Sequence, residues 1–354
     1  MFTRRMLPVS ILLTLILTLM VTASVSAQEA DDLGGSAVFR DANAASDSLV
    51  MSFSDVPSLD DGSAYEGWLL DSAGGKVSVG ILNRSGTGDI EQTYVSPSGE
   101  NLAASYSRFA ISIEPDPDPD PETPGPIVYA DAIPSAAFPH LGHLVVAWSP
   151  NPDEKGIAVG FREQMAVASV HANLAQRSAS LADQQKHSQH VINIIEGSGG
   201  ANYDASPGNP GDGFGVLNYG ADLIKHAQLA KDAAPEDDSV NDGADAAIEA
   251  AGSALDRAER ALLEALLVVT PGTSDFRIEQ ALRNQVSLTE GGVTDANAAY
   301  TGSQDIGLFE GLAGGAPPSV GDPLVPTAAM VALLAGLLLT GAGGLLVFRR
   351  RQTA

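Results

Sequence analysis

Histidines are the residues of this chain that could bind a metal ion. All six lie between His140 and His226, although the chain has 354 residues. Neutral imidazoles that meet in a bundle core can ligate zinc, copper or haem. Four of them fall on apolar stripes with helical spacing and are therefore the candidate ligands of one metal site: His171, His187, His190 and His226. The alternative, that each is a hydrogen-bonded core or interface residue, stays open.

The spacing along the chain indicates which of these rings could meet. If two antiparallel helices turn near Ala182, His171 and His190 lie within roughly one helical turn of the same height. By the same count His226 should come level with His187. No Glu precedes any of these histidines by three residues, so the paired Glu-x-x-His motif of di-iron bundles is absent.

Motifs of catalysis are missing from the sequence. There is no G-x-S-x-G elbow, no P-loop and no H-E-x-x-H motif. The absence of cysteine excludes disulfides, thiolate metal sites and a cysteine nucleophile. The loop 202–213 is rich in Asp, Asn and Gly, but Gly215 stands where a calcium loop has its bidentate Glu, so we interpret it as a turn-rich connection. We expect a protein that is not an enzyme.

The charge of the chain restricts its partners. With 44 acidic and 19 basic residues the formal charge is -25. Such a surface repels phosphate, so we expect no nucleic-acid partner. An unknown protein or small-molecule ligand remains as the partner.

Helices must position the histidines. From Asn151 the apolar period changes to 3.6 and predicts helices that end near Leu181, at Gly197, before Pro235 and near Thr270, with a weaker fifth helix over 274–288. We therefore predict an antiparallel helical bundle over 133–290, followed by a linker over 291–326.

Strands are predicted before the bundle. Apolar residues alternate with polar ones in three segments of 36–132, and Gly-rich turn signals separate the segments. The expected inward residues are Leu49, Met51, Phe53, Val77, Val79, Ile81, Phe109, Ile111 and Ile113. This pattern predicts an antiparallel β-sandwich. On composition alone, the Pro-Asp run 114–126 would be an interdomain linker.

Four segments resemble, in order and spacing, the extracytoplasmic C-terminal domain of anti-sigma-K factors. They are Tyr65-Glu66-Gly67-Trp68-Leu69, Val79-Gly80-Ile81-Leu82, Phe109 to Pro115 and Pro124 to Tyr129. The resemblance implies that the Pro-Asp run is an insertion before the last strand and that Trp68 packs in or against the core. It also implies a binding or sensing module. Factors of this family hold the sigma factor with a cytoplasmic N-terminal domain, which a signal peptide replaces here.

Two apolar ends predict a membrane topology. Residues 1–27 read as a signal peptide, and 328–348 as a transmembrane helix followed by three arginines in a cytoplasmic tail, 349–354. We expect a single-pass protein of the plasma membrane with its ectodomain outside, anchored in the lipid bilayer. Small residues recur every four positions in this helix and predict a homodimer face: Ala332, Gly336, Thr340 and Gly344.

Together these patterns predict an α+β multidomain fold, with an antiparallel β-sandwich followed by an antiparallel helical bundle and one C-terminal transmembrane helix. The function expected is that of a membrane-anchored extracytoplasmic binding or sensing protein. The alternative is a metal or haem binder at the cell surface whose histidine bundle holds the cofactor.

Overall fold

Eight antiparallel strands form one sheet in the part of the chain that the computed structural model describes, residues 32–314. The strands are β1 (Leu33–Arg40), β2 (Ser48–Phe53), β3 (Ser63–Leu70), β4 (Lys76–Leu82), β5 (Ile90–Val95), β6 (Arg108–Pro115), β7 (Ile127–Ala132) and β8 (Phe309–Gly314). Their order is β4-β3-β6-β7-β8-β1-β2-β5. The Gln92 side chain of β5 donates to the carbonyl of Ile81 in β4 at 3.1 Å. The outer strands therefore approach each other, and the sheet is nearly a closed barrel.

The predicted alternation holds in β2 and changes in β4. Leu49, Met51 and Phe53 are buried in the core as expected. In β4 the pairing with β3 shifts next to Gly80, which has a φ of 96°. This bulge reverses the faces beyond it. Ile81 is therefore 44% exposed and Leu82 is buried, so the inward assignment of Ile81 was wrong.

Strand β6 is buried on both faces. Phe109 and Ile111 face the main core, while Ala110 packs with Trp68 and Leu70 on the opposite face. Trp68 is only 1% exposed. This residue therefore packs against the sheet, as the resemblance implied.

The chain beyond the bundle returns to the sheet. Strand β8 pairs with β7 on one side and β1 on the other, so the helices are inserted between two neighbouring strands. The predicted order of a complete sandwich followed by a bundle was wrong. The predicted linker over 291–326 was wrong too as far as residue 314, where the described residues end. The Pro-Asp run connects the paired strands β6 and β7, so it is an insertion within the β domain and not an interdomain linker.

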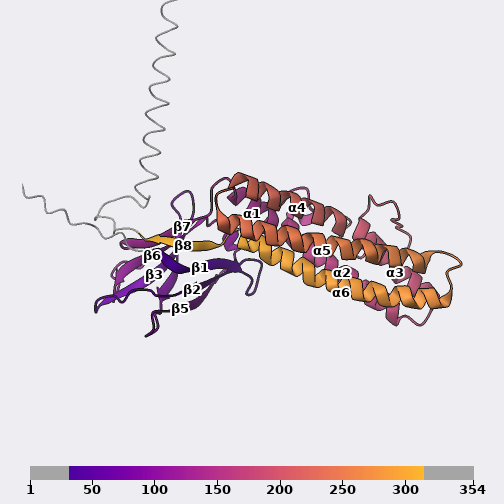
Figure 1. The fold of residues 1–354 in the computed structure, drawn as a ribbon, viewed down its shortest axis with the longest axis horizontal. Helices are drawn as coiled ribbons and strands as arrows, with labels where there is room; N and C mark the ends of the chain where they lie inside the picture. Colours follow the sequence, from indigo (N-terminus) through magenta and orange to yellow (C-terminus); the bar gives the residue numbers. More distant parts are fainter. Residues whose placement is uncertain (1–31, 315–354) are drawn as a thin grey trace, which may run out of the picture.

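Six α-helices make up most of the rest of the described structure. They are α1 (Phe138–Val145), α2 (Ile157–Arg177), α3 (Leu181–Glu196), α4 (Val216–Ala233), α5 (Asp238–Val269) and α6 (Asp275–Asp305). The bundle extends from one end of the sheet, with α1 beside the sheet and α3 toward the far end (Figure 1). Side-chain caps explain two of the starts: Ser180 accepts from the Asp183 N–H, and Asp237 from the Val240 N–H.

Small residues let α5 and α6 pack closely. Seven alanines on α5 are fully buried: Ala244, Ala247, Ala251, Ala254, Ala258, Ala261 and Ala265. On α6, a Cβ added to Gly302 would lie 2.6 Å from the backbone nitrogen of Ala247. Helix α6 runs well past the expected end at 288, because packing against α5 compensates for its weak helical signal.

Polar contacts join the bundle to the β1–β2 loop. Asp41 accepts hydrogen bonds from the Tyr300 hydroxyl at 2.7 Å and the Gln304 amide at 2.9 Å. Arg162 of α2 pairs with the same carboxylate at 2.9 Å, and its guanidinium lies 3.6 Å from the centre of the Tyr300 ring. These contacts fix the β domain to the base of α2 and α6.

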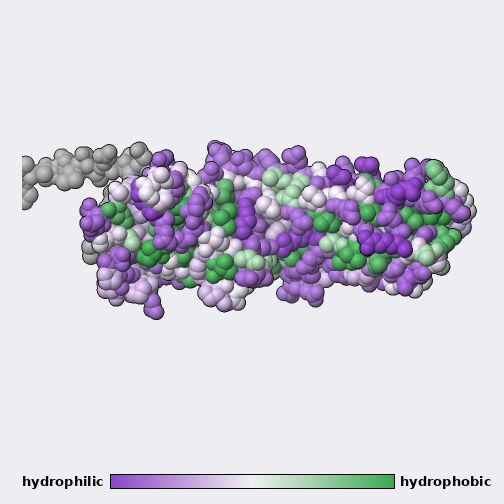
Figure 2. Space-filling view, turned by 90° about the horizontal axis from the view of Figure 1, so that it is seen from below, coloured by the Kyte–Doolittle hydropathy of each residue, from purple (hydrophilic) through white to green (hydrophobic). Residues whose placement is uncertain are grey.

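No helix within residues 32–314 is both long enough and apolar enough to cross a membrane. Hydrophilic residues lie along the whole face of the bundle in Figure 2, between smaller apolar patches. For the described chain, the single-pass membrane fold and the plasma-membrane localisation were therefore wrong. The segments on which they rested, 1–27 and 328–354 with the expected dimer face, lie outside the described residues.

Candidate metal centre

Three of the four predicted ligands lie together between α2 and α3. His171 is on α2, and His187 and His190 are one turn apart on α3. Nδ1 of His171 lies 3.2 Å from Nδ1 of His187 and 3.2 Å from Nδ1 of His190. Because the turn 178–180 makes α2 and α3 neighbours, the expected meeting of His171 and His190 occurs. We call these three residues the α2–α3 triad.

A hydrogen bond orients His190 within this triad. Its Nε2 lies 2.9 Å from the carbonyl oxygen of Pro207, which can only accept. Nε2 therefore carries a proton, and Nδ1 faces Nδ1 of His171. The Pro207 loop is itself held by Asn193, whose amide donates to the carbonyls of Asp204 and Gly208 at 2.6 and 3.0 Å. The turn-rich loop thus supports the triad.

The surroundings of the triad keep the rings of His171 and His187 uncharged. Burial, together with the nearby His190, His187 and Lys186, lowers the pKa of His171 to about 4. Burial also lowers the pKa of His187, with further lowering from His190 and Lys186 and an opposing effect of Asp183. Neutral imidazole is the form that ligates a metal, so His171 and His187 are ready to do so at pH 7.

The distances fit one small metal ion. Nitrogens bound at about 2.0–2.1 Å to a tetrahedral zinc lie about 3.3 Å from one another. Both Nδ1 distances of 3.2 Å match that separation. A haem iron takes at most two protein ligands, so three imidazole nitrogens within 4.8 Å of one another suit a single small ion better.

His226 is not part of this triad, so the four-residue site was wrong in that member. It lies on α4, which packs mainly on α5, α2 and α1, and meets His140 and His143 of α1. We call these three residues the α1–α4 triad. No helix was predicted over 138–145, so His140 and His143 were not among the predicted ligands. Their i, i+3 spacing beside a Pro at the start of a helix was the available signal.

Three carboxylates also approach one another in the β domain: Glu66, Glu114 and Asp118. Burial raises the pKa of Glu66, and the neighbouring Glu114 and Asp118 raise it further against a hydrogen bond from Ser78. Glu114 accepts hydrogen bonds from the hydroxyl of Ser112 and from the Gly125 N–H. Both buried glutamates thus accept hydrogen bonds from donors of the protein itself.

The comparisons with known proteins support the family resemblance of the β domain. Residues 18–127, about a third of the chain, match the family described as anti-sigma-K factor rskA, C-terminal. This confirms the resemblance, and it gives the β domain a likeness to anti-sigma factors. No curated protein and no solved structure matches the chain. The match ends at the start of β7, so the helices that carry the histidines lie outside it.

Proposed function

We propose that this protein binds a transition-metal ion, zinc in the first place, through His171, His187 and His190. The observation that carries the proposal is the pair of 3.2 Å distances that join the three Nδ1 atoms. Imidazole nitrogen suits zinc, copper and nickel better than magnesium or calcium, which prefer oxygen.

The three-ligand arrangement favours a site that exchanges its fourth ligand. Three protein ligands leave one position of a tetrahedral zinc for water or an external group. His171 and His187 are only partly buried, so this position is near solvent. Such a site suits reversible binding or sensing. We propose a binding role and not an enzymatic one, because the sequence carries no catalytic motif.

The β domain favours a second candidate function, the binding of a protein or small molecule as in anti-sigma factors. The observation behind it is the family match over residues 18–127. Because factors of this family hold the sigma factor with a separate N-terminal domain, we expect the β domain to bind a different partner. Size exclusion of the purified protein mixed with sigma factors of the same organism tests this. Separate elution is the expected result, and co-elution with a sigma factor would contradict it.

Zinc titration of the metal-free protein tests the metal role. The titration uses the His143→Gln protein as its background, because a second group of histidines is also present. In this background only the α2–α3 triad keeps all three of its histidines. A metal that binds only the folded state at a hundredfold excess over Kd stabilises it by about 2.7 kcal/mol. We expect this stabilisation in thermal unfolding, and we expect His187→Gln to remove most of it.

Lys186→Gln is the matched control. Its side chain neighbours both His171 and His187 but is not a ligand, and its positive charge opposes a cation. Zinc should therefore stabilise the Lys186→Gln protein as much as the background or more. An equal zinc effect in the His187→Gln and Lys186→Gln proteins would refute the proposed ligands.

A further inference from the structure

A second group of histidines joins α1 to α4. His140 and His143 lie one turn apart on α1, and Nδ1 of His143 is 3.3 Å from Nδ1 of His226 on α4. Each of the three rings offers a nitrogen, and these nitrogens lie within 4.8 Å of one another. We infer that the α1–α4 triad is a second transition-metal site. It shares no ligand with the α2–α3 triad and does not depend on it.

An unsatisfied buried atom provides independent support. Nδ1 of His140 is buried and has no hydrogen-bond partner within residues 32–314. Buried polar atoms in folded proteins are almost always paired, so an orphan nitrogen in a group of histidines points to a missing partner. A metal ion accepts the lone pair of such a nitrogen. It also replaces the close contact between the nitrogens of His143 and His226 with two coordinate bonds.

The chemistry of the group selects the class of metal. Imidazole nitrogen is the only kind of ligand in it, which favours zinc, copper or nickel over magnesium or calcium. His226 is 4% exposed, and burial, with the nearby His143, His140 and Lys225, lowers its pKa to about 4. Burial also lowers the pKa values of His140 and His143. The rings are therefore neutral at pH 7 and available as ligands.

A tryptophan beside the triad provides a built-in reporter. The Trp148 ring centre lies 4.4 Å from that of His143 and 4.5 Å from that of His226. The only other tryptophan, Trp68, is in the β domain. Copper(II) bound at the triad would quench the fluorescence of an indole at contact distance.

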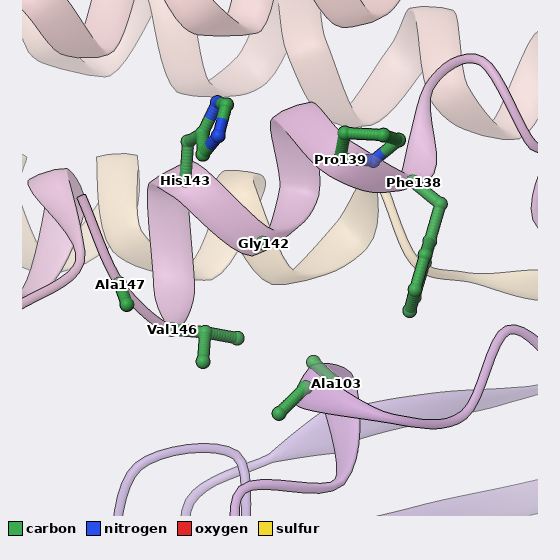
Figure 3. A pocket seen from close by; sticks show the side chains of 8 residues that line it. Ala103, Phe138, Pro139, Gly142, His143, Val146 and Ala147 are labelled. Atoms are coloured by element: carbon green, nitrogen blue, oxygen red, sulfur yellow. The ribbon is translucent and has the colours of Figure 1, made fainter. Parts of the chain in front are cut away.

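The position of α1 gives the site a structural consequence. Helix α1 follows β7, and its C-terminal carbonyl at Val145 accepts a hydrogen bond from the Asn101 side chain of the β domain at 3.0 Å. An open depression of about 230 Å³ lies where α1 meets Ala103 of the β domain. The His143 ring points away from Ala103, toward the helices behind α1 (Figure 3). A metal bound at the α1–α4 triad would hold α1 against α4, and through α1 it would also hold the β domain.

Zinc stoichiometry of the full chain tests the inference. After equilibrium dialysis of metal-free protein, we expect two zinc ions per chain in the wild type. One should remain in His143→Gln/His226→Gln and one in His171→Gln/His187→Gln. Two zinc ions in His143→Gln/His226→Gln would overturn the second site. A single zinc ion in the wild type that His171→Gln/His187→Gln removes would overturn it too, while leaving the proposed function intact.

Fluorescence provides a readout that does not require replacing the buried His226. Copper(II) should quench the wild type and His171→Gln/His187→Gln alike. The His143→Gln protein, in which a partly buried ring is replaced, should need at least about tenfold more copper than the wild type to reach the same quenching. The quenching should disappear in Trp148→Phe. Quenching that is unchanged in His143→Gln, or that persists in Trp148→Phe, would overturn the second site.

Discussion

Replacing Trp68 by alanine should remove a large part of the stability of the β domain. The side chain is 1% exposed and packs with Leu70 and Ala110 on the face of the sheet opposite the main core. Its indole N–H donates to the hydroxyl of Ser112 at 2.9 Å. Deleting a buried tryptophan side chain costs about 3–5 kcal/mol, against a typical total of about 5–15 kcal/mol for a domain.

A second replacement separates the hydrogen bond from the packing. Trp68→Phe keeps an aromatic ring but loses the N–H donor, so it should cost about 1–3 kcal/mol, less than Trp68→Ala. Trp148→Phe is the control, because the Trp148 N–H has no hydrogen-bond partner within residues 32–314 and its loss should cost less than that of Trp68.

Urea unfolding of the metal-free proteins measures the stability of all three variants. The midpoints should fall in the order Trp148→Phe, Trp68→Phe, Trp68→Ala, with Trp68→Ala lowest and the slopes unchanged. A Trp68→Ala protein with the wild-type midpoint would show that this side chain contributes nothing to the sheet, and would refute the packing described above.

Three further perturbations test the helices and their junction. Gly302→Ala should destabilise by about 1–3 kcal/mol, because the new Cβ meets the α5 backbone at 2.6 Å, while Gly252→Ala, with no atom within 4 Å of its Cβ, should stabilise by about 0.5–1 kcal/mol. Chemical denaturation that ranks them the other way contradicts the close packing of α5 and α6. Since the pKa values of His171 and His226 fall from 6.5 to about 4 on folding, the unfolded chain binds protons that the folded chain does not. The free energy of unfolding of the metal-free protein should therefore be highest above pH 6.5 and should decline as the pH falls toward 4. Urea midpoints measured from pH 8 to 5 should decline less in the His171→Gln protein than in the wild type. Equal declines in the two proteins would count against the burial of this ring. Asp41→Asn should cost about 1–3 kcal/mol at pH 7, because it removes one charge of a hydrogen-bonded ion pair between the β domain and the bundle, and an unchanged melting temperature would show that the junction does not depend on it.

Local patterns predicted the elements whose signal lies in adjacent residues. Alternation located β2 and β6, and Gly197, with a φ of 75°, ended α3 where expected. The alanine-rich period of α5 predicted its end at Val269 to within one residue. The resemblance to anti-sigma-K factors added what composition could not, that the Pro-Asp run lies within the β domain.

The features that the sequence did not predict depend on distant partners. Strand β8 has six residues in a Gly-rich segment, and its pairing with β1 spans most of the chain. A count of heights along helices could bring His171 and His190 together, but it could not tell that α4 would place His226 against α1. The neighbours of α4 depend on how the helices pack around one another, and the helical period of apolar residues does not determine this packing.

X-ray absorption at the zinc edge tests the central claim most directly. The measurement uses the full chain with His143→Gln/His226→Gln, loaded with one equivalent of zinc, so that His171, His187 and His190 are the intended ligands. The account predicts three imidazole nitrogens at about 2.0–2.1 Å from zinc and one further light ligand. Fewer than two imidazoles in the first shell, or a spectrum unchanged by adding His187→Gln, would contradict it.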